Sequence, residues 1–155
     1  MDYLAHNQHK MPRASSPSRD RKALVIRMYD MLNAFQFTKI EVNNGYNKHP
    51  AYRHVHSPDL IGMLENTQYI FDVETQDSLS EAAAFHRLDY FSKFAEKYQA
   101  VYVVAVPEGI EESTQQLVRC LGLPNTIVFP INNLPLRPSS PASDNSMLFM
   151  QRKPS

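Results

Sequence analysis

The chain has 155 residues, of which 43% are hydrophobic, and this is enough for one domain of ordinary size. Lys plus Arg and Asp plus Glu both number 16, so bulk charge does not indicate a strongly basic nucleic-acid binder. A single cysteine, Cys120, excludes an internal disulfide and fits a reducing, cytoplasmic location. No run of about 18 apolar residues is present, so we expect no membrane span.

Both ends of the chain are polar. Residues 1–18 contain prolines, serines and basic residues, and we expect them to form a disordered basic arm. Residues 132–155 are rich in proline and serine, and we expect a flexible tail. An apolar island at residues 147–150 in this tail would dock on the chain itself or on a protein partner, or have no role. The folded domain is therefore predicted to span residues 19–131.

The first predicted elements are a helix, a short strand and a hairpin. Apolar side chains recur at helical spacing from Asp20 to Phe35, and Ile40 and Val42 alternate with polar residues in a strand at 39–43. Residues 45–52 read as a loop. Residues 60–64 and 68–74 are predicted strands, joined by a turn at Glu65, Asn66 and Thr67.

Two helices and two strands are predicted to follow. Ser78 or Ser80 caps a helix that runs to Tyr98, and residues 100–106 form an apolar strand that we expect to be buried on both faces. A helix over 110–121 ends at Gly122, and residues 125–131 form the last strand. Cys120 lies on that helix beside two leucines, so we expect a buried structural thiol.

The order of these elements, αβββαβαβ, predicts an α/β fold with a mixed sheet flanked by helices. Its second half also has the order of a βαβ unit, so a nucleotide-binding fold is an alternative. Neither GxGxxG nor GxxxxGK[ST] occurs, and the chain has only 4 glycines, so a loop that cradles phosphates is not expected.

Acidic residues gather on the predicted hairpin, at Pro58-Asp59 and Asp72-Val73-Glu74. Strand side chains alternate between faces, so Asp72 and Glu74 share one face. In one hairpin register Asp59 lies opposite Asp72, and in the other it lies opposite Glu74. Either register places three carboxylates within reach of one divalent cation, the kind of oxygen site that serves phosphoryl chemistry.

These residues resemble the motif of the PD-(D/E)xK nuclease superfamily, whose fold is restriction-endonuclease-like. The resemblance implies an αβββαβ core, here with an additional C-terminal helix and strand. It also implies Mg²⁺ or Mn²⁺, with Asp59, Asp72 and Glu74 as metal ligands and catalytic residues. The family pattern has lysine where this chain has Glu74, although some members carry an acid there, and the nearest lysine is Lys93 on the following helix.

Two functions therefore remain open. One is metal-dependent hydrolysis of nucleic-acid phosphodiester bonds, with DNA expected before RNA and with a homodimer as one arrangement. The other is an inactive domain of the same fold that binds nucleic acid or a protein partner. Near the acids, a His-x-His pair is an alternative metal site, and basic and aromatic residues suit contacts with a nucleic acid. These residues are His54, His56, Lys48, Arg53, Tyr46 and Tyr52.

Overall fold

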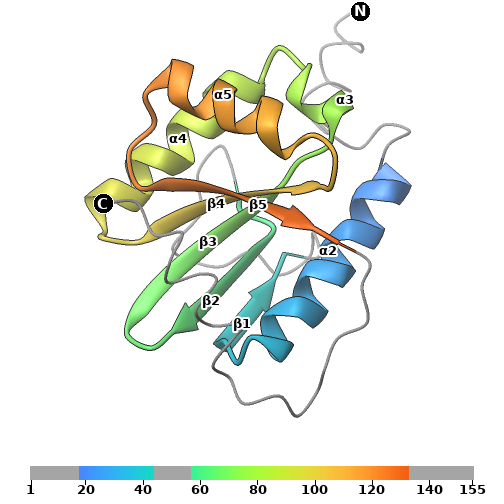
Figure 1. Cartoon of the computed structure of the whole chain (residues 1–155). Helices are drawn as coiled ribbons and strands as arrows, with labels where there is room; N and C mark the ends of the chain where they lie inside the picture. Colours follow the sequence, from blue (N-terminus) through green and yellow to red (C-terminus); the bar gives the residue numbers. More distant parts are fainter. Residues whose placement is uncertain (1–17, 44–56, 133–155) are drawn as a thin grey trace, which may run out of the picture.

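The structure is a computed structural model that describes residues 18–43 and 57–132 (Figure 1). The elements, in chain order, are α2 (Ser18–Ala34), β1 (Thr38–Val42), β2 (Leu60–Leu64), β3 (Thr67–Val73), α3 (Gln76–Leu79), α4 (Ala84–Lys97), β4 (Val101–Pro107), α5 (Glu111–Leu121) and β5 (Thr126–Ile131). The predicted order of helices and strands is confirmed, apart from the division of one helix into two.

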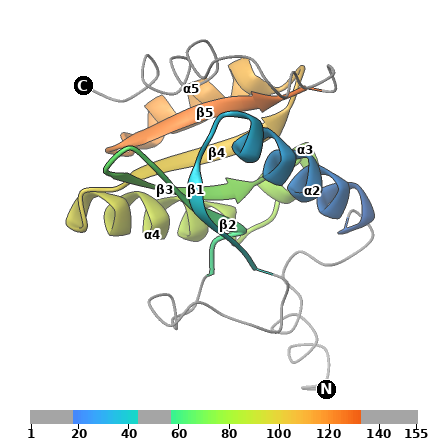
Figure 2. The ribbon, with the colours of Figure 1, turned by 90° about the horizontal axis from the view of Figure 1, so that it is seen from below.

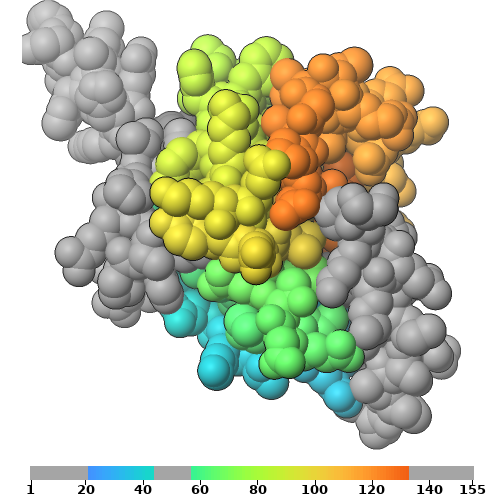
Figure 3. Space-filling model, turned by 90° about the vertical axis from the view of Figure 1, so that its left-hand side faces the viewer, coloured from blue at the N-terminus to red at the C-terminus, as the bar shows by residue number. Residues whose placement is uncertain are grey.

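The five strands form one mixed sheet in the order β1-β2-β3-β4-β5. β1 and β2 are antiparallel, as are β2 and β3, whereas β3, β4 and β5 run parallel to one another. The carboxyl ends of three neighbouring strands therefore meet at one edge of the sheet, which we call the carboxyl edge. Figure 3 looks at the opposite end, where the green β2–β3 hairpin and the yellow end of α4 lie side by side on the surface.

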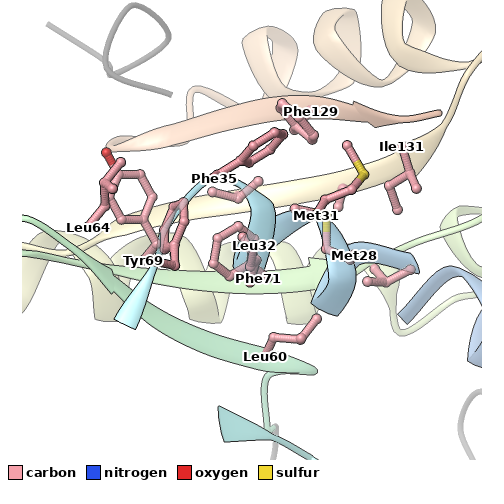
Figure 4. Packing of buried hydrophobic residues seen from close by; sticks show 14 of the residues in the cluster. Met28, Met31, Leu32, Phe35, Leu60, Leu64, Tyr69, Phe71, Phe129 and Ile131 are labelled. Carbon is pink, nitrogen blue, oxygen red and sulfur yellow. The ribbon is translucent and has the colours of Figure 1, made fainter. Parts of the chain in front are cut away.

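Helix α2 covers one face of the sheet and α4 and α5 cover the other (Figure 1, Figure 2). The predicted helical stripe packs as expected, since Met28, Leu32 and Phe35 are buried against β3 and β5 (Figure 4). Phe37 joins this cluster by lying across Gly62, where a Cβ atom would come within 3.1 Å of the Phe37 ring. A side chain at position 62 would therefore displace that ring.

The opposite face is buried by the apolar stripes of α4 and α5. Leu88, Phe91 and Ala95 of α4 and Val118 of α5 pack against alternate residues of β3, β4 and β5. Residues 101–106 are all buried, so the prediction that this strand is covered on both faces is confirmed. Gly122 ends α5 in the left-handed conformation with φ of 62°, as predicted.

The predicted helix from Ser78 or Ser80 to Tyr98 is wrong in its first turns. Thr75 caps the short helix α3, its side chain accepting a hydrogen bond from the Ser78 main-chain N–H, and α4 begins separately at Ala84 without a side-chain cap. Tyr98 lies past the last turn of α4 and is exposed. The capping box of Thr75 and Ser78 ends the strand sharply, which brings the start of α3 next to the end of β3.

The expectation of a buried Cys120 is also wrong, because the side chain is exposed. Thr114 and Val118 form the buried side of α5. Each helical residue turns by about 100°, so Cys120, two positions after Val118, points away from the sheet. The neighbouring leucines misled the prediction because Leu121 is itself exposed at 37%.

Most of the predicted arm, the 45–52 loop and the predicted tail lie outside the described residues. The same holds for the His54 and His56 pair and for the basic and aromatic residues around it. Within residues 18–43 and 57–132, no helix is long and apolar enough to cross a membrane.

Candidate functional site

The predicted acids lie at the carboxyl edge of the sheet. In parallel α/β sheets this edge is where ligands bind, because the loops that follow the strands diverge there. Asp72 and Glu74 stand at the end of β3, and Asp59 stands just before β2, which pairs with β3. All three side chains are buried. Because a buried carboxylate requires hydrogen bonds or a cation, the partners of each acid define what the site can do.

The hairpin has the first of the two predicted registers. Leu64 pairs with Thr67 and Leu60 pairs with Phe71, which is the last paired position of the two strands. The main-chain N–H of Asp59 still donates to the carbonyl of Phe71 at 2.9 Å. On the other side, the Val73 N–H donates to Oδ2 of Asp59 at 2.7 Å. The Asp59 side chain therefore extends the hydrogen-bond ladder and is fixed in orientation by it.

Arg21, in the first turns of α2, reaches across this end of the hairpin. Its Nε donates to the main-chain oxygen of Val73 at 3.1 Å, and its Nη2 donates to Oδ1 of Asp59, with which it forms a salt bridge. One guanidinium thus binds two oxygen atoms, a carboxylate oxygen and a carbonyl oxygen, from neighbouring strands. The Arg21 side chain keeps 18% of its surface exposed, so this salt bridge lies at the rim of the site.

Asp72 lies deeper, toward α4. Its side chain is fully buried, and its Oδ2 accepts a hydrogen bond from the hydroxyl of Tyr102, on β4, at 3.0 Å. Burial and the nearby negative charge of Asp72 raise the pKa of Tyr102 well above 10. The phenol therefore remains protonated and acts as a constant hydrogen-bond donor to Asp72.

Glu74 forms the centre of a buried network that joins β3 to α3 and α4. Arg87 of α4 binds it through two parallel hydrogen bonds, Nε to Oε2 at 3.1 Å and Nη2 to Oε1 at 2.8 Å. The Ser78 hydroxyl donates to Oε1 of Glu74 at 2.5 Å. The remaining arm of Arg87 contacts Glu81 at 3.3 Å. This paired, enclosed geometry is the strong form of an arginine–carboxylate interaction.

The structure thus confirms the hairpin register as far as Leu60 and Phe71, but the Asp59 N–H bonds to the Phe71 carbonyl, so Asp59 does not continue the pairing to Asp72. Each of the three acids has its own protein partner. Within residues 18–43 and 57–132, no three His, Cys, Asp or Glu side chains form a group able to hold a metal ion. The role of Asp59, Asp72 and Glu74 as metal ligands remains a prediction. Lys93, the nearest lysine in the sequence, is 70% exposed and pairs with Asp89.

Three residues that bind the acids, Arg21, Arg87 and Tyr102, were not predicted from the sequence. Arg87 carried a usable signal, because it falls on the packing stripe of α4 between Ala84 and Leu88, where a charged residue must find a buried partner. Tyr102 is the one hydroxyl-bearing residue within the apolar stretch 100–106. For Arg21 the sequence offered only its place on the inward side of α2.

Comparisons of the chain with protein-family models, with curated proteins and with solved structures found no match.

Proposed function

We propose that the chain is a restriction-endonuclease-like domain that hydrolyses nucleic-acid phosphodiester bonds with Mg²⁺ or Mn²⁺. The order α2-β1-β2-β3-α4-β4 agrees with the αβββαβ core that the sequence resemblance implies, with α5 and β5 as the added helix and strand. Asp72 lies on the third strand, Glu74 directly follows that strand, and Asp59 directly precedes the second strand. DNA is the expected substrate, since the resemblance is to enzymes that act chiefly on it.

One observation carries the proposal: the positively charged side chain of Arg21 is bound at this edge by oxygen atoms of β3 and of the residue before β2. The carboxylate of Asp59 and the main-chain oxygen of Val73 converge on the Arg21 guanidinium. Mg²⁺ is commonly bound by only one or two carboxylates, and waters and substrate phosphate complete its shell. The carboxylate oxygen of Asp59 and the main-chain oxygen of Val73 are therefore suitable ligands for a divalent cation, even without a group of three acidic side chains.

The ion would polarise the scissile phosphate and lower the pKa of a bound water. The residues of the chain prepare that site. The Val73 N–H orients the Asp59 carboxylate, and the Tyr102 hydroxyl fixes that of Asp72. Glu74 acts differently from the sequence prediction in this proposal. Because Arg87 and Ser78 bind both of its oxygens, Glu74 holds the end of β3 in place instead of contacting the ion.

Calorimetry with Mg²⁺ and Mn²⁺, together with cleavage assays on single- and double-stranded DNA and on RNA, tests this function. Asp59→Asn and Asp72→Asn should each abolish cleavage and weaken metal binding, since they remove a charge and keep the side-chain volume. Asp89→Asn is the matched control, because Asp89 pairs only with the exposed Lys93 among the contacts described for it. Wild-type protein that neither binds metal nor cuts any of these substrates would contradict the proposal.

An inactive domain that binds nucleic acid is the second candidate, and the Glu74–Arg87 pair favours it. The position that holds lysine in the family pattern here carries an acid that is neutralised from α4. Binding would then depend on phosphate contacts by the basic N-terminal arm. Removing residues 1–18 should weaken DNA binding and flatten its salt dependence. Binding that is lost on this deletion, without any cleavage by the full chain, would select this candidate over the nuclease.

A further inference from the structure

We propose that Arg21 is a built-in competitor of the metal: its guanidinium occupies the cation position at Asp59 and Val73, and a divalent ion binds there only when Arg21 leaves. This inference rests on the proposed function and describes how its site is regulated.

The oxygen atoms are held in place without help from Arg21. Oδ2 of Asp59 accepts from the Val73 N–H, so the direction of Oδ1 is set by the hairpin itself. The Val73 carbonyl ends a strand that pairs with β4 in register, with Val73 beside Ala105. Two oxygens fixed by the sheet remain in position when the guanidinium moves away. They then form a negatively charged oxygen pair, which a hard divalent ion satisfies well.

Arg21 can leave without undoing α2. The helix is fixed to the sheet by its buried apolar residues, including Met28 and Leu32, and by the hydrogen bond of 2.7 Å from Nε of Arg27 to the main-chain oxygen of Asn132. Arg21 lies on the inward side of α2 but near the start of the helix, beyond these buried residues, and its side chain is partly exposed. A released guanidinium moves into water, where its charge is well solvated.

Arg87 shows what a fixed arginine looks like in the same protein. Its side chain is 4% exposed, and its donors are engaged by Glu74, Glu81 and the main-chain oxygen of Ser78. Removing that guanidinium would leave a buried carboxylate without its cation, which is costly. Among the described residues, the carboxylate pairs of Arg87 are enclosed, whereas the pair of Arg21 with Asp59 lies at the surface and is open enough to exchange its cation.

Competition lowers the apparent affinity for the ion, because the site is available only in the fraction of molecules from which Arg21 has departed. Titration of the full chain with Mn²⁺ by calorimetry measures this directly. Arg21→Gln should bind Mn²⁺ roughly tenfold more tightly than the wild type, or more. Arg21→Gln/Asp59→Asn should lose that gain. Arg27→Gln also removes a hydrogen bond from an arginine of α2 to the main chain near a strand end, and it should leave the affinity for Mn²⁺ unchanged.

The outcomes separate this inference from the proposed function. Equal Mn²⁺ affinity of the wild type and Arg21→Gln would overturn the competition and leave the metal site standing. Absence of Mn²⁺ binding in both folded proteins would overturn the two together. If Arg21→Gln fails to fold, Arg21→Lys replaces it: lysine keeps the charge but cannot bond both oxygens at once, so tighter binding than the wild type is again expected and equal binding again overturns the competition.

The side-chain NMR signal of Arg21 tests the same inference on the wild-type protein, without requiring that a variant folds. The Arg21 Nε–H, which donates to the Val73 carbonyl, should give a protected arginine side-chain signal in a ¹⁵N spectrum. Arg21→Lys identifies that signal by its absence. Addition of Mg²⁺ to saturation should move the signal toward that of a solvated arginine and speed its exchange with water. A signal that keeps its position and protection at saturating Mg²⁺ would show that Arg21 stays in place and would overturn the inference.

Discussion

The two faces of β3 carry different side chains at the end of the strand, apolar on one face and acidic on the other. Toward α2, Phe71 and Val73 are buried in an apolar cluster that continues to the strand end. Toward α4, the apolar residue Ile70 is followed by Asp72 and Glu74, both fully buried. The α2 face is stabilised by the area it removes from water, whereas the α4 face depends on particular partners for its two acids.

This difference explains why the arginines of the two faces behave differently in the structure. An apolar face needs no cation, so Arg21 of α2 sits at the rim of its cluster and binds across the strand end. The acids on the α4 face need a cation, so Arg87 is drawn inside. The α4 face should therefore be sensitive to any change of charge, and the rim at Arg21 should be far more tolerant.

The largest effect is expected for Glu74→Lys. It restores the lysine of the family pattern but sets an ammonium beside Arg87 in a site without water access at Glu74. Breaking a buried pair costs about 3–5 kcal/mol, and a second buried cation adds to this, so urea unfolding should show a loss of that size or greater. Glu74→Lys/Arg87→Glu should recover part of the loss. A single variant as stable as the wild type would show that the pair is not structural.

Alkaline pH should affect both faces, because each carries a buried tyrosine. Burial and then the charge of Glu65 raise the pKa of Tyr69, on the α2 face, to about 12, and burial raises that of Tyr102 well above 10. The folded state holds these protons more tightly than the unfolded state, whose tyrosines titrate near 10. The stabilisation is therefore complete below pH 10 and is lost as pH rises above it.

Urea midpoints measured from pH 8 to 12 check this dependence. Tyr69→Phe and Tyr102→Phe should each make the loss of stability above pH 10 less steep, since phenylalanine has no proton to lose. Tyr102→Phe should also lower stability at neutral pH by about 1–3 kcal/mol, because Asp72 loses a buried donor. Slopes that match the wild type in both variants would contradict the assignment of the alkaline transition to these residues.

The fold could be predicted because its signals are local. The periodicity of apolar residues located each strand and two of the three predicted helices to within one or two residues. A two-residue loop within the predicted turn at Glu65, Asn66 and Thr67 limited the hairpin to two registers. The error at α3 was also local. Thr75 and Ser78 satisfy each other's main-chain N–H groups, so Ser78 lies inside the short helix α3 and is not the N-cap of a longer helix, as had been predicted.

The partners of the acids could not be predicted in the same way. Arg21 and Asp59 are 38 positions apart in the chain, and Tyr102 and Asp72 are 30 apart. A long arginine side chain reaches any of several neighbours once the layers have packed, so spacing in the sequence does not select one. The position of an arginine among the apolar residues of a helix is the one sequence feature that predicts a buried partner. It indicates Arg87 more clearly than Arg21, because Arg87 lies between buried residues.

A smaller effect is expected for Thr75→Ala. Thr75 caps α3, and its hydroxyl accepts from the Ser78 N–H at 3.1 Å, which holds the Ser78 hydroxyl against Glu74. Loss of an N-cap costs about 1 kcal/mol. Thr75→Ser should keep the cap and recover most of the stability, because serine retains the hydroxyl. Equal losses in both variants would show that the methyl group of Thr75, and not its hydroxyl, stabilises this end of β3.

The smallest effect on stability is expected for Lys93→Ala. Lys93 and Asp89 form an exposed pair one turn apart on α4, with Nζ and Oδ2 separated by 3.1 Å. Such pairs contribute about 0.3–0.5 kcal/mol, and alanine recovers part of this through its helix propensity, so the unfolding midpoint should hardly change. Cleavage by an active domain should also be retained, since Lys93 lies on the solvent side of α4 while Asp72 and Glu74 lie beneath its buried side. Loss of cleavage in a variant with unchanged stability would instead identify Lys93 as the displaced lysine of the family pattern and would place the substrate on the outer side of α4.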